Sequence, residues 1–104
     1  MHKLMWEILV PAYGKQESFS YEYHNRWTSF VREIAGGLSV LSGIKGEWIA
    51  PDGTLFRDRM IPVRIVCSEE EIEQIIQFTI KHYNQKAVLA YQVSNYVIIR
   101  HRKD

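Results

Sequence analysis

Two segments of this chain have the apolar periodicity of a helix, and each follows a segment rich in β-forming residues. Between residues 21 and 38, apolar side chains recur every three or four positions: Trp27, Phe30, Val31, Ile34, Ala35 and Leu38. Ser20 is a suitable N-cap, and Gly36 or Gly37 can end the helix in the left-handed conformation. This spacing predicts an amphipathic helix with one buried face.

A second helix is predicted after Ser68, which forms a capping-box pattern with Glu71. Its apolar stripe has the same helical spacing: Ile72, Ile75, Ile76, Ile80 and Tyr83. Asn84 is suited to the left-handed conformation, so we expect it to end this helix.

The first and last segments of the chain are rich in β-forming residues. Residues 4–10 are apolar except for Glu7 and end at Pro11, which predicts a strand with most of both faces covered. Residues 87–93 and 96–100 are also β-rich, and they form either one long strand or, as we favour, two short arms separated by a turn.

The segments between the two helices predict a hairpin. Residues 38–49 form a strand that we expect to bend at its glycines, and residues 55–67 form the next. Pro62 conflicts with a central strand because it has no N–H to donate, so a break or bulge is expected there. The turn at 51–53 sets the register of the hairpin. The expected opposite pairs are Ala50 with Thr54, Trp48 with Phe56, and Glu47 with Arg57.

The resulting order, β-α-β-β-α-β, is that of a ferredoxin-like α+β fold. Right-handed crossovers place both helices on one face of an antiparallel sheet. A chain of 104 residues is the size of one domain. We therefore predict a single ferredoxin-like two-layer sandwich over residues 1–104, with an extra C-terminal strand if residues 96–100 pair.

Strand alternation predicts an apolar surface on the sheet face without helices. That face is expected to carry Val40, Ser42, Ile44, Gly46, Trp48, Phe56, Met60, Pro62, Arg64 and Val66. The helices are expected to cover Ile61, Val63, Ile65 and Cys67. A large exposed apolar face predicts a homo-oligomer, most simply a dimer formed by sheet packing. A shift of one residue at a glycine would invert the assignment.

Composition limits the classes of function. The chain has 46% hydrophobic and 24% charged residues and a net charge of +1, so it is globular and its overall field favours neither nucleic acid nor membrane. Cys67 is the single cysteine, no signal peptide is apparent, and no apolar run would span a membrane. We expect a cytoplasmic protein without a cofactor.

Candidate chemical groups are few. The four histidines show no metal-ligand spacing, and His24 is a candidate general base, although a histidine on a helix surface is the commoner situation. Cys67 is expected to be a small buried apolar residue. The hairpin gathers one candidate site for a ligand or partner: Glu47, Trp48, Phe56, Arg57 and Arg59. The two arginines point the same way and could meet one anion, or the charges simply make an exposed hairpin soluble.

Parts of the chain resemble a known family. The pattern comprises Trp27 and Phe30, then residues 37–41 (GLSVL), 46–48 (GEW), Gly53 and 83–89 (YNQKAVL). It is similar, over about residues 20 to 93, to a family of small bacterial proteins that share a domain of unknown function. Those proteins have Gly-Leu-Thr-Val-Leu, Gly-x-Trp and Phe-Gly-Gln-x-x-Val-Leu, whereas this chain has one more residue between positions 41 and 48 and Asn84 in place of a glycine. The resemblance implies a fold but no chemistry.

Two functions from different classes remain open. The first is a non-catalytic oligomeric module that binds a partner or small ligand through its sheet and hairpin. The alternative is a cofactor-free dimeric enzyme for a small anionic or aromatic substrate, with His24 as the base and Arg57 or Arg59 holding the anion. The enzyme predicts an enclosed pocket with a perturbed titratable group, and the module predicts a shallow face. Nucleic-acid binding through the arginines and the basic residues 100–103 is the weakest alternative.

Overall fold

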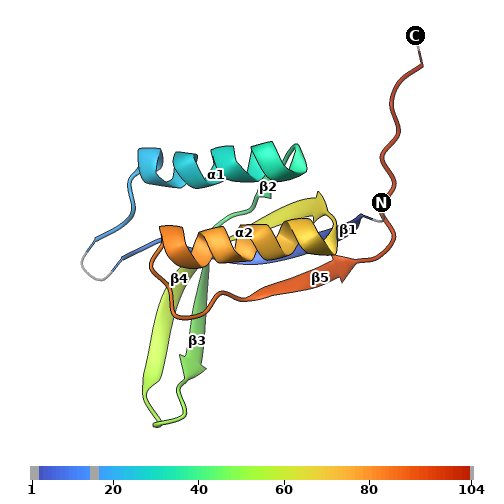
Figure 1. Cartoon of the computed structure of the whole chain (residues 1–104). Coiled ribbons are helices and arrows are strands. Elements are labelled where there is room, and N and C mark those ends of the chain that lie inside the picture. The colour runs from blue at the N-terminus through green and yellow to red at the C-terminus, as the bar shows by residue number, and fades with distance from the viewer. Residues whose placement is uncertain (1–2, 15–16, 104) are drawn as a thin grey trace.

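The structure, a computed structural model, describes residues 3–14 and 17–103, and in them two helices and an antiparallel sheet form one α+β unit (Figure 1). The elements are β1 (Leu4–Pro11), α1 (Tyr21–Ala35), β2 (Ser39–Val40), β3 (Ile44–Ile49), β4 (Leu55–Cys67), α2 (Glu69–His82) and β5 (Ala90–Ser94). The strands lie in the order β2-β4-β1-β5, and β3 also pairs with β4. With β2 and β3 as two parts of one edge strand, this is the ferredoxin-like arrangement, and the predicted fold class is confirmed.

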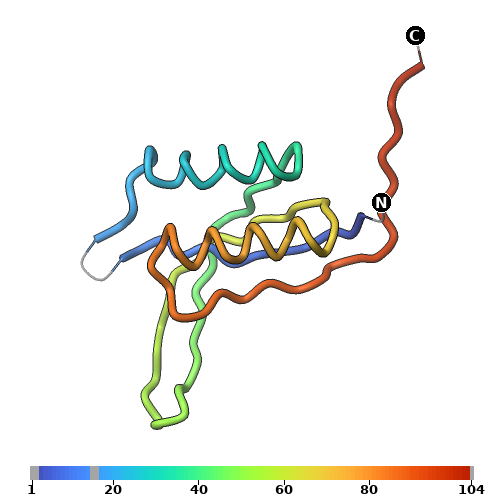
Figure 2. The backbone as a smooth tube through the Cα atoms, viewed as in Figure 1, coloured from blue at the N-terminus to red at the C-terminus, as the bar shows by residue number. Residues whose placement is uncertain are grey.

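Both helices lie on the same side of the sheet (Figures 1 and 2). The core fills the layer between the helices and the sheet. The buried side chains come from the helix stripes and from alternate positions of the two central strands: Ile8, Val10, Trp27, Val31, Val63, Ile65, Cys67, Ile72, Ile75 and Tyr83. The prediction that Val63, Ile65 and Cys67 face the helices is therefore confirmed.

Helix α1 begins and ends at the predicted signals. The Ser20 side chain accepts a hydrogen bond from the Tyr23 N–H at 3.1 Å. Gly36 has φ 89°, and its N–H donates to the carbonyl of Arg32 at 2.8 Å. The helix ends at Ala35, before Leu38, because the left-handed conformation at Gly36 turns the chain away from the helix axis. Leu38 still packs against the core.

Helix α2 has the predicted capping box. The Ser68 hydroxyl accepts from the Glu71 N–H at 3.2 Å, and the Glu71 carboxylate accepts from the Ser68 N–H at 2.8 Å. Asn84, just after the helix, has φ 53°, as its type predicted.

We expect Ser68→Ala to lower the free energy of unfolding by about 1 kcal/mol, because one N–H in the first turn of α2 loses its acceptor. Chemical denaturation measures this loss. Ser42→Ala is the matched control, since Ser42 is exposed and outside the helices and strands, and its effect should stay below about 0.5 kcal/mol. Equal losses in the two variants would contradict the capping role.

The edge of the sheet agrees only in part with the prediction. Residues 38–49 form two strands rather than one, and β4 does not break at Pro62. The other predicted outcome, a bulge, is found in the strand beside it. The Pro62 carbonyl accepts from the Leu41 N–H at 2.9 Å, but proline has no N–H to return. The irregularity therefore falls on the neighbouring edge strand, which is interrupted between Val40 and Ile44.

The interruption also shifts the strand alternation by one residue. Val40 pairs with Val63, whereas Ile44 pairs with Met60, so an extra residue lies in the edge strand. Opposite residues share a face. Val40 thus lies on the helix side with Val63, and placing it on the same face as Ile44 was wrong.

The C-terminal part forms one strand, β5, rather than two arms, so the extra strand at 96–100 was a wrong prediction. β5 is at the sheet edge and pairs with β1. Residues 95–103, called the tail below, leave this edge and extend away from the sheet (Figure 1). The described part of the chain offers them no neighbouring strand, so their backbone forms no ladder.

Candidate functional site

The hairpin projects beyond the body of the protein (Figure 1). β1 pairs with β4 only up to Pro11 and Met60. Residues 44–60 are called the arm below, and beyond Met60 its two strands pair only with each other. The described chain has a radius of gyration of 15.0 Å and a longest extent of 55 Å. A compact domain of this length has a radius of about 13 Å. The arm and the tail therefore make the single chain elongated.

The predicted hairpin register is confirmed. Ala50 donates to the Thr54 carbonyl at 2.8 Å, and Trp48 lies opposite Phe56. The two rings stack with centroids 4.6 Å apart and planes 15° apart. The indole N–H of Trp48 donates to the Asp58 carboxylate at 2.9 Å. The aromatic pair is thus held in one orientation although Trp48 is 50% and Phe56 40% exposed.

The charged residues of the predicted site lie on the other face of the arm. Glu47 is opposite Arg57, and their side chains form an ion pair at 2.8 Å. Arg59 lies on the same face, opposite Lys45. The structure therefore places the five predicted residues on one arm but divides them between two faces, with Arg57 already paired. An exposed pair of this kind is worth about 0–1 kcal/mol, so it shapes the surface more than it stabilises the fold.

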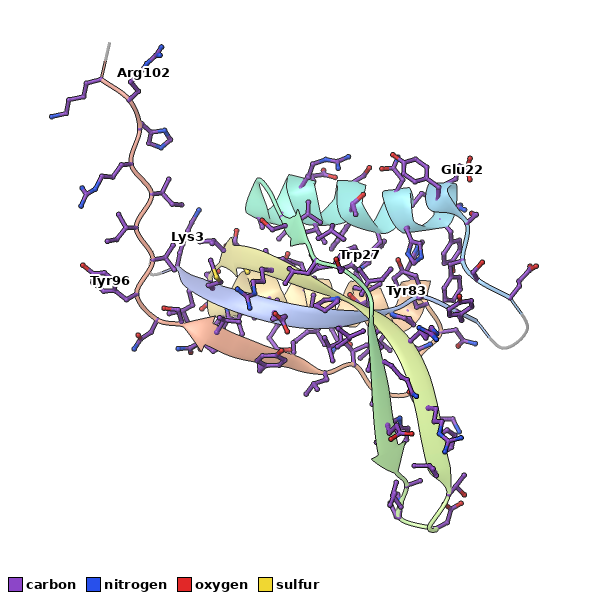
Figure 3. All side chains as sticks on the ribbon, turned by 180° about the vertical axis from the view of Figure 1, so that it is seen from behind. Lys3, Glu22, Trp27, Tyr83, Tyr96 and Arg102 are labelled. Atoms are coloured by element: carbon purple, nitrogen blue, oxygen red, sulfur yellow. The ribbon has the colours of Figure 1, made fainter. Side chains whose placement is uncertain are left out.

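His24 lies in a cluster of rings that joins the start of α1 to the end of α2. Tyr83, labelled in Figure 3, is part of this cluster. Its Nδ1 is 2.6 Å from the Tyr83 hydroxyl. Tyr23 stacks on His82 with centroids 4.1 Å apart, its hydroxyl donates to the His82 carbonyl, and the His82 Nε2 is 2.8 Å from the Tyr23 carbonyl. Phe19 packs beside Tyr23 and Tyr83. The cluster ties two helix ends together.

These contacts favour a structural role for His24. Burial lowers the pKa of His24, and the charge of His82 lowers it further, so the neutral imidazole is favoured. Burial raises the pKa of Tyr83, which keeps its hydroxyl protonated. His24 and the arginines of the arm, which the enzyme hypothesis needs in one pocket, lie on different parts of the molecule (Figure 1).

Cys67 is fully buried, as its apolar strand predicted. Burial raises the pKa of its thiol to about 11, so the thiolate that a nucleophile requires is disfavoured near neutrality.

A network of polar side chains on the helix-free face was not predicted from the sequence. Glu7 is only 6% exposed, and its carboxylate accepts from Arg64 Nε at 3.0 Å and from the Tyr91 hydroxyl. The Tyr91 hydrogen bond, and then that of Arg64, lower the pKa of Glu7. Because an ionised network occupies the middle of this face, the expectation of an apolar sheet surface was wrong there. The lone charge in an apolar strand was the one sequence signal, and its partners lie 57 and 84 positions away.

A cavity of about 370 Å³ opens beside this network, where the end of α1, the start of β1 and the tail meet. Its described lining includes the polar residues Lys3, Arg64 and Ser39. Its apolar lining residues include Met5, Leu38, Val66 and Ile99. This cavity is therefore a candidate site for a small molecule that the sequence did not predict.

Two searches of the described residues were negative. Among residues 3–14 and 17–103, no three histidine, cysteine or acidic side chains lie close enough together to hold a metal ion. No described helix has both the length and the apolar character needed to cross a membrane.

Solved structures with the same fold exist, although sequence comparison finds no relative. No protein-family model matches the chain, and the comparison with curated proteins finds no match. The periplasmic divalent cation tolerance protein CutA from Archaeoglobus fulgidus is 14% identical, with a TM-score of 0.64 over 97% of this chain and 88% of that chain. CutA1 from the psychrotrophic Shewanella sp. SIB1 is 14% identical, with a TM-score of 0.65 over 97% and 85%.

A phage SAM lyase in complex with S-methyl-5'-thioadenosine is similar to the same degree, with 15% identity and a TM-score of 0.65 over 90% of this chain and 82% of that chain. Cation tolerance proteins and a lyase thus share this fold. Since one fold hosts several functions, these likenesses support the ferredoxin-like architecture and leave function to the site.

Proposed function

We propose that this protein is a non-catalytic homo-oligomeric binding module, whose copies associate through the arm and the tail. The observation that carries the proposal is that large apolar side chains are exposed on each of these two projecting segments: Ile44, Trp48, Ile49, Leu55, Phe56, Tyr96 and Ile98. Single exposed apolar residues are ordinary, but several on one projecting segment indicate an interface.

A second copy of the chain is the partner that fits this surface best. The outer edge of β3 carries backbone groups that pair with no strand in the described chain, and residues 95–101 form an extended segment outside every described strand. An open edge and an extended segment can complete each other by adding a strand between copies. The net charge of +1 opposes such association only weakly. The simplest assembly is a dimer.

We expect size-exclusion chromatography with light scattering to give a multiple of the single-chain mass over a wide concentration range. The double variant Trp48→Ser/Phe56→Ser should shift the assembly toward the single chain by at least tenfold in dissociation constant. The matched control is Glu47→Gln/Arg57→Gln, which removes the ion pair from the opposite face of the same arm.

Either of two results would reject this assembly. One is a single-chain mass at every concentration of the unmodified protein. The other is a double variant at Trp48 and Phe56 that assembles as tightly as the control. Circular dichroism of each variant establishes that the fold is retained.

The alternative is the cofactor-free enzyme, which the likeness in fold to a lyase supports. The position of His24 favours it less, because that side chain is hydrogen-bonded inside a packed ring cluster. We propose a cytoplasmic location on the sequence alone. The resemblance of residues 20 to 93 to a bacterial family also stays a prediction.

A further inference from the structure

We infer that the cavity at the end of α1 binds a small organic anion with an apolar body, such as an aromatic carboxylate or phosphate ester. The inference names a ligand class for the proposed binding module. It rests on the proposal that the chain is a binding module, and not on the proposed oligomer. The cavity measures about 370 Å³, within the range of small-molecule sites.

Two basic residues at the same end of the sheet line the cavity: Lys3, just before β1, and Arg64 of β4. Lys3 is an exposed residue just before β1, and Figure 3 shows it at the end of the sheet from which the tail leaves. Arg64 reaches the cavity from β4 and uses Nε for its bond to Glu7. A guanidinium has four further N–H donors on its terminal nitrogens, which suit an oxyanion. No described residue in the lining is acidic.

Two charge effects oppose an anion. The carboxylate of Glu7 already pairs with Arg64, so it balances the charge of that guanidinium. The carboxyl end of α1 lies at the cavity and carries the negative end of the helix dipole, equivalent to about half a charge. That half charge is less than the full charge of Lys3, so Lys3 supplies the net positive charge and Arg64 contributes N–H donors. Ser39, opposite Arg64 in the sheet, contributes a hydroxyl that can donate to the same anion.

The remaining walls indicate that the anion carries an apolar group. Met5 and Val66 are a cross-strand pair, and Ile99 reaches the cavity from the tail. Ile99 is largely exposed without a ligand, so a bound apolar body would cover it. Gly37 leaves its part of the lining open, since a Cβ built there would meet nothing within 4 Å.

The test is a titration of the full ¹⁵N-labelled chain, followed by amide chemical shifts, with benzoate, phenyl phosphate, inorganic phosphate and benzylamine as probes. We expect benzoate or phenyl phosphate to give saturable shifts at residues 36–39 and at Met5. Benzylamine has a similar ring but the opposite charge and should bind at least tenfold more weakly. Inorganic phosphate lacks the ring and should also bind more weakly. The stronger of the two organic anions identifies the anionic group.

Two variants test the assignment to this cavity. Lys3→Gln should weaken binding of the preferred anion at least threefold, whereas the matched control Lys86→Gln, an exposed lysine after α2, should leave it unchanged. Gly37→Leu places a side chain in the open lining and should abolish saturation while the rest of the spectrum is preserved. Gly37 has no positive φ, so this substitution is not strained by the backbone.

The inference is overturned if neither organic anion saturates these amides, or if benzylamine or inorganic phosphate binds as tightly. It is also overturned if Lys3→Gln or a folded Gly37→Leu binds like the unmodified chain. Light scattering on the same samples tests the oligomer separately from anion binding. A protein that has the mass of a single chain and still binds the anion would reject only the proposed oligomer.

Discussion

Replacing Trp27 with alanine should lower the free energy of unfolding by about 3–5 kcal/mol, the usual cost of removing a large aromatic side chain from a core. Trp27 is 1% exposed and is the largest fully buried side chain among the described residues. Its indole N–H donates to Thr79 at 2.8 Å, and the Thr79 hydroxyl donates in turn to the Ile75 carbonyl at 2.6 Å. The substitution leaves a cavity between the helices and removes their buried hydrogen bond.

Urea denaturation of Trp27→Ala measures this loss, and Trp48→Ala is the matched control because its indole is half exposed. The control should cost no more than about 1 kcal/mol at a concentration where the chain is not assembled. Thr79→Val separates the hydrogen bond of Trp27 from its packing. This substitution keeps the side-chain volume at position 79 but leaves the indole N–H of Trp27 without an acceptor, which should lower the free energy of unfolding by about 1–3 kcal/mol. A Trp27→Ala loss no larger than that of the control would contradict this account of the core.

Replacing Arg64 with alanine should cost about 1–3 kcal/mol at pH 7, because Glu7 would remain as a nearly buried carboxylate with Tyr91 as its one remaining side-chain partner. The Arg64 side chain is 43% exposed, so solvent screening keeps the loss below that of a fully buried ion pair. Arg57→Ala breaks the exposed pair with Glu47 and is the matched control, with an expected cost of about 0–1 kcal/mol.

The same network predicts a dependence of stability on pH. The pKa of Glu7 is lowered in the folded protein from its ordinary value of 4.5, chiefly by the Tyr91 hydrogen bond. A lowered pKa means that the folded state favours the carboxylate. The stabilisation is therefore complete above pH 4.5 and is lost as the pH falls through the folded pKa. Tyr91→Phe should reduce this acid-sensitive part.

Unfolding free energies at pH 7 and pH 3 test this linkage. The cost of Arg64→Ala should be smaller at pH 3 than at pH 7, because protonation of Glu7 removes the charge that Arg64 stabilises and the variant, which lacks Arg64, protonates Glu7 at higher pH. The cost of Arg57→Ala should change little between the two pH values. Equal costs of Arg64→Ala at both pH values would show that the ion pair with Glu7 is not the source of its effect.

Features set by neighbours in the sequence were predictable. Ser20, Gly36 and Ser68 act on backbone groups within four positions, so their capping roles follow from residue type and spacing. The hairpin register follows from the three-residue turn at 51–53, which leaves one way of pairing Trp48 with Phe56.

Features that depend on residues distant in the sequence could not be predicted. Pro62 was expected to disturb its own strand. The interruption instead lies in the neighbouring edge strand, because that strand lacks the hydrogen bond that the N–H of another residue would donate to it. The predicted ligand site on the hairpin was only partly correct. The pairs Glu47–Arg57 and Trp48–Phe56 were predicted correctly, but successive residues of a strand point to opposite faces, so the charged side chains and the rings lie on different faces of the arm. The cavity lies in another part of the protein.

The order of elements, the helix ends, the hairpin and the ferredoxin-like plan were determined by the sequence, because periodicity and turn chemistry act over a few residues. Tertiary structure alone decided that Arg64 and Tyr91 meet Glu7, that His24 lies among rings, and that Lys3, Arg64 and Ile99 line one cavity. These groups come from segments up to 96 positions apart (Lys3 to Ile99). Such contacts arise from the way the strands pair in the sheet and the helices pack on it, and no local sequence pattern predicts them.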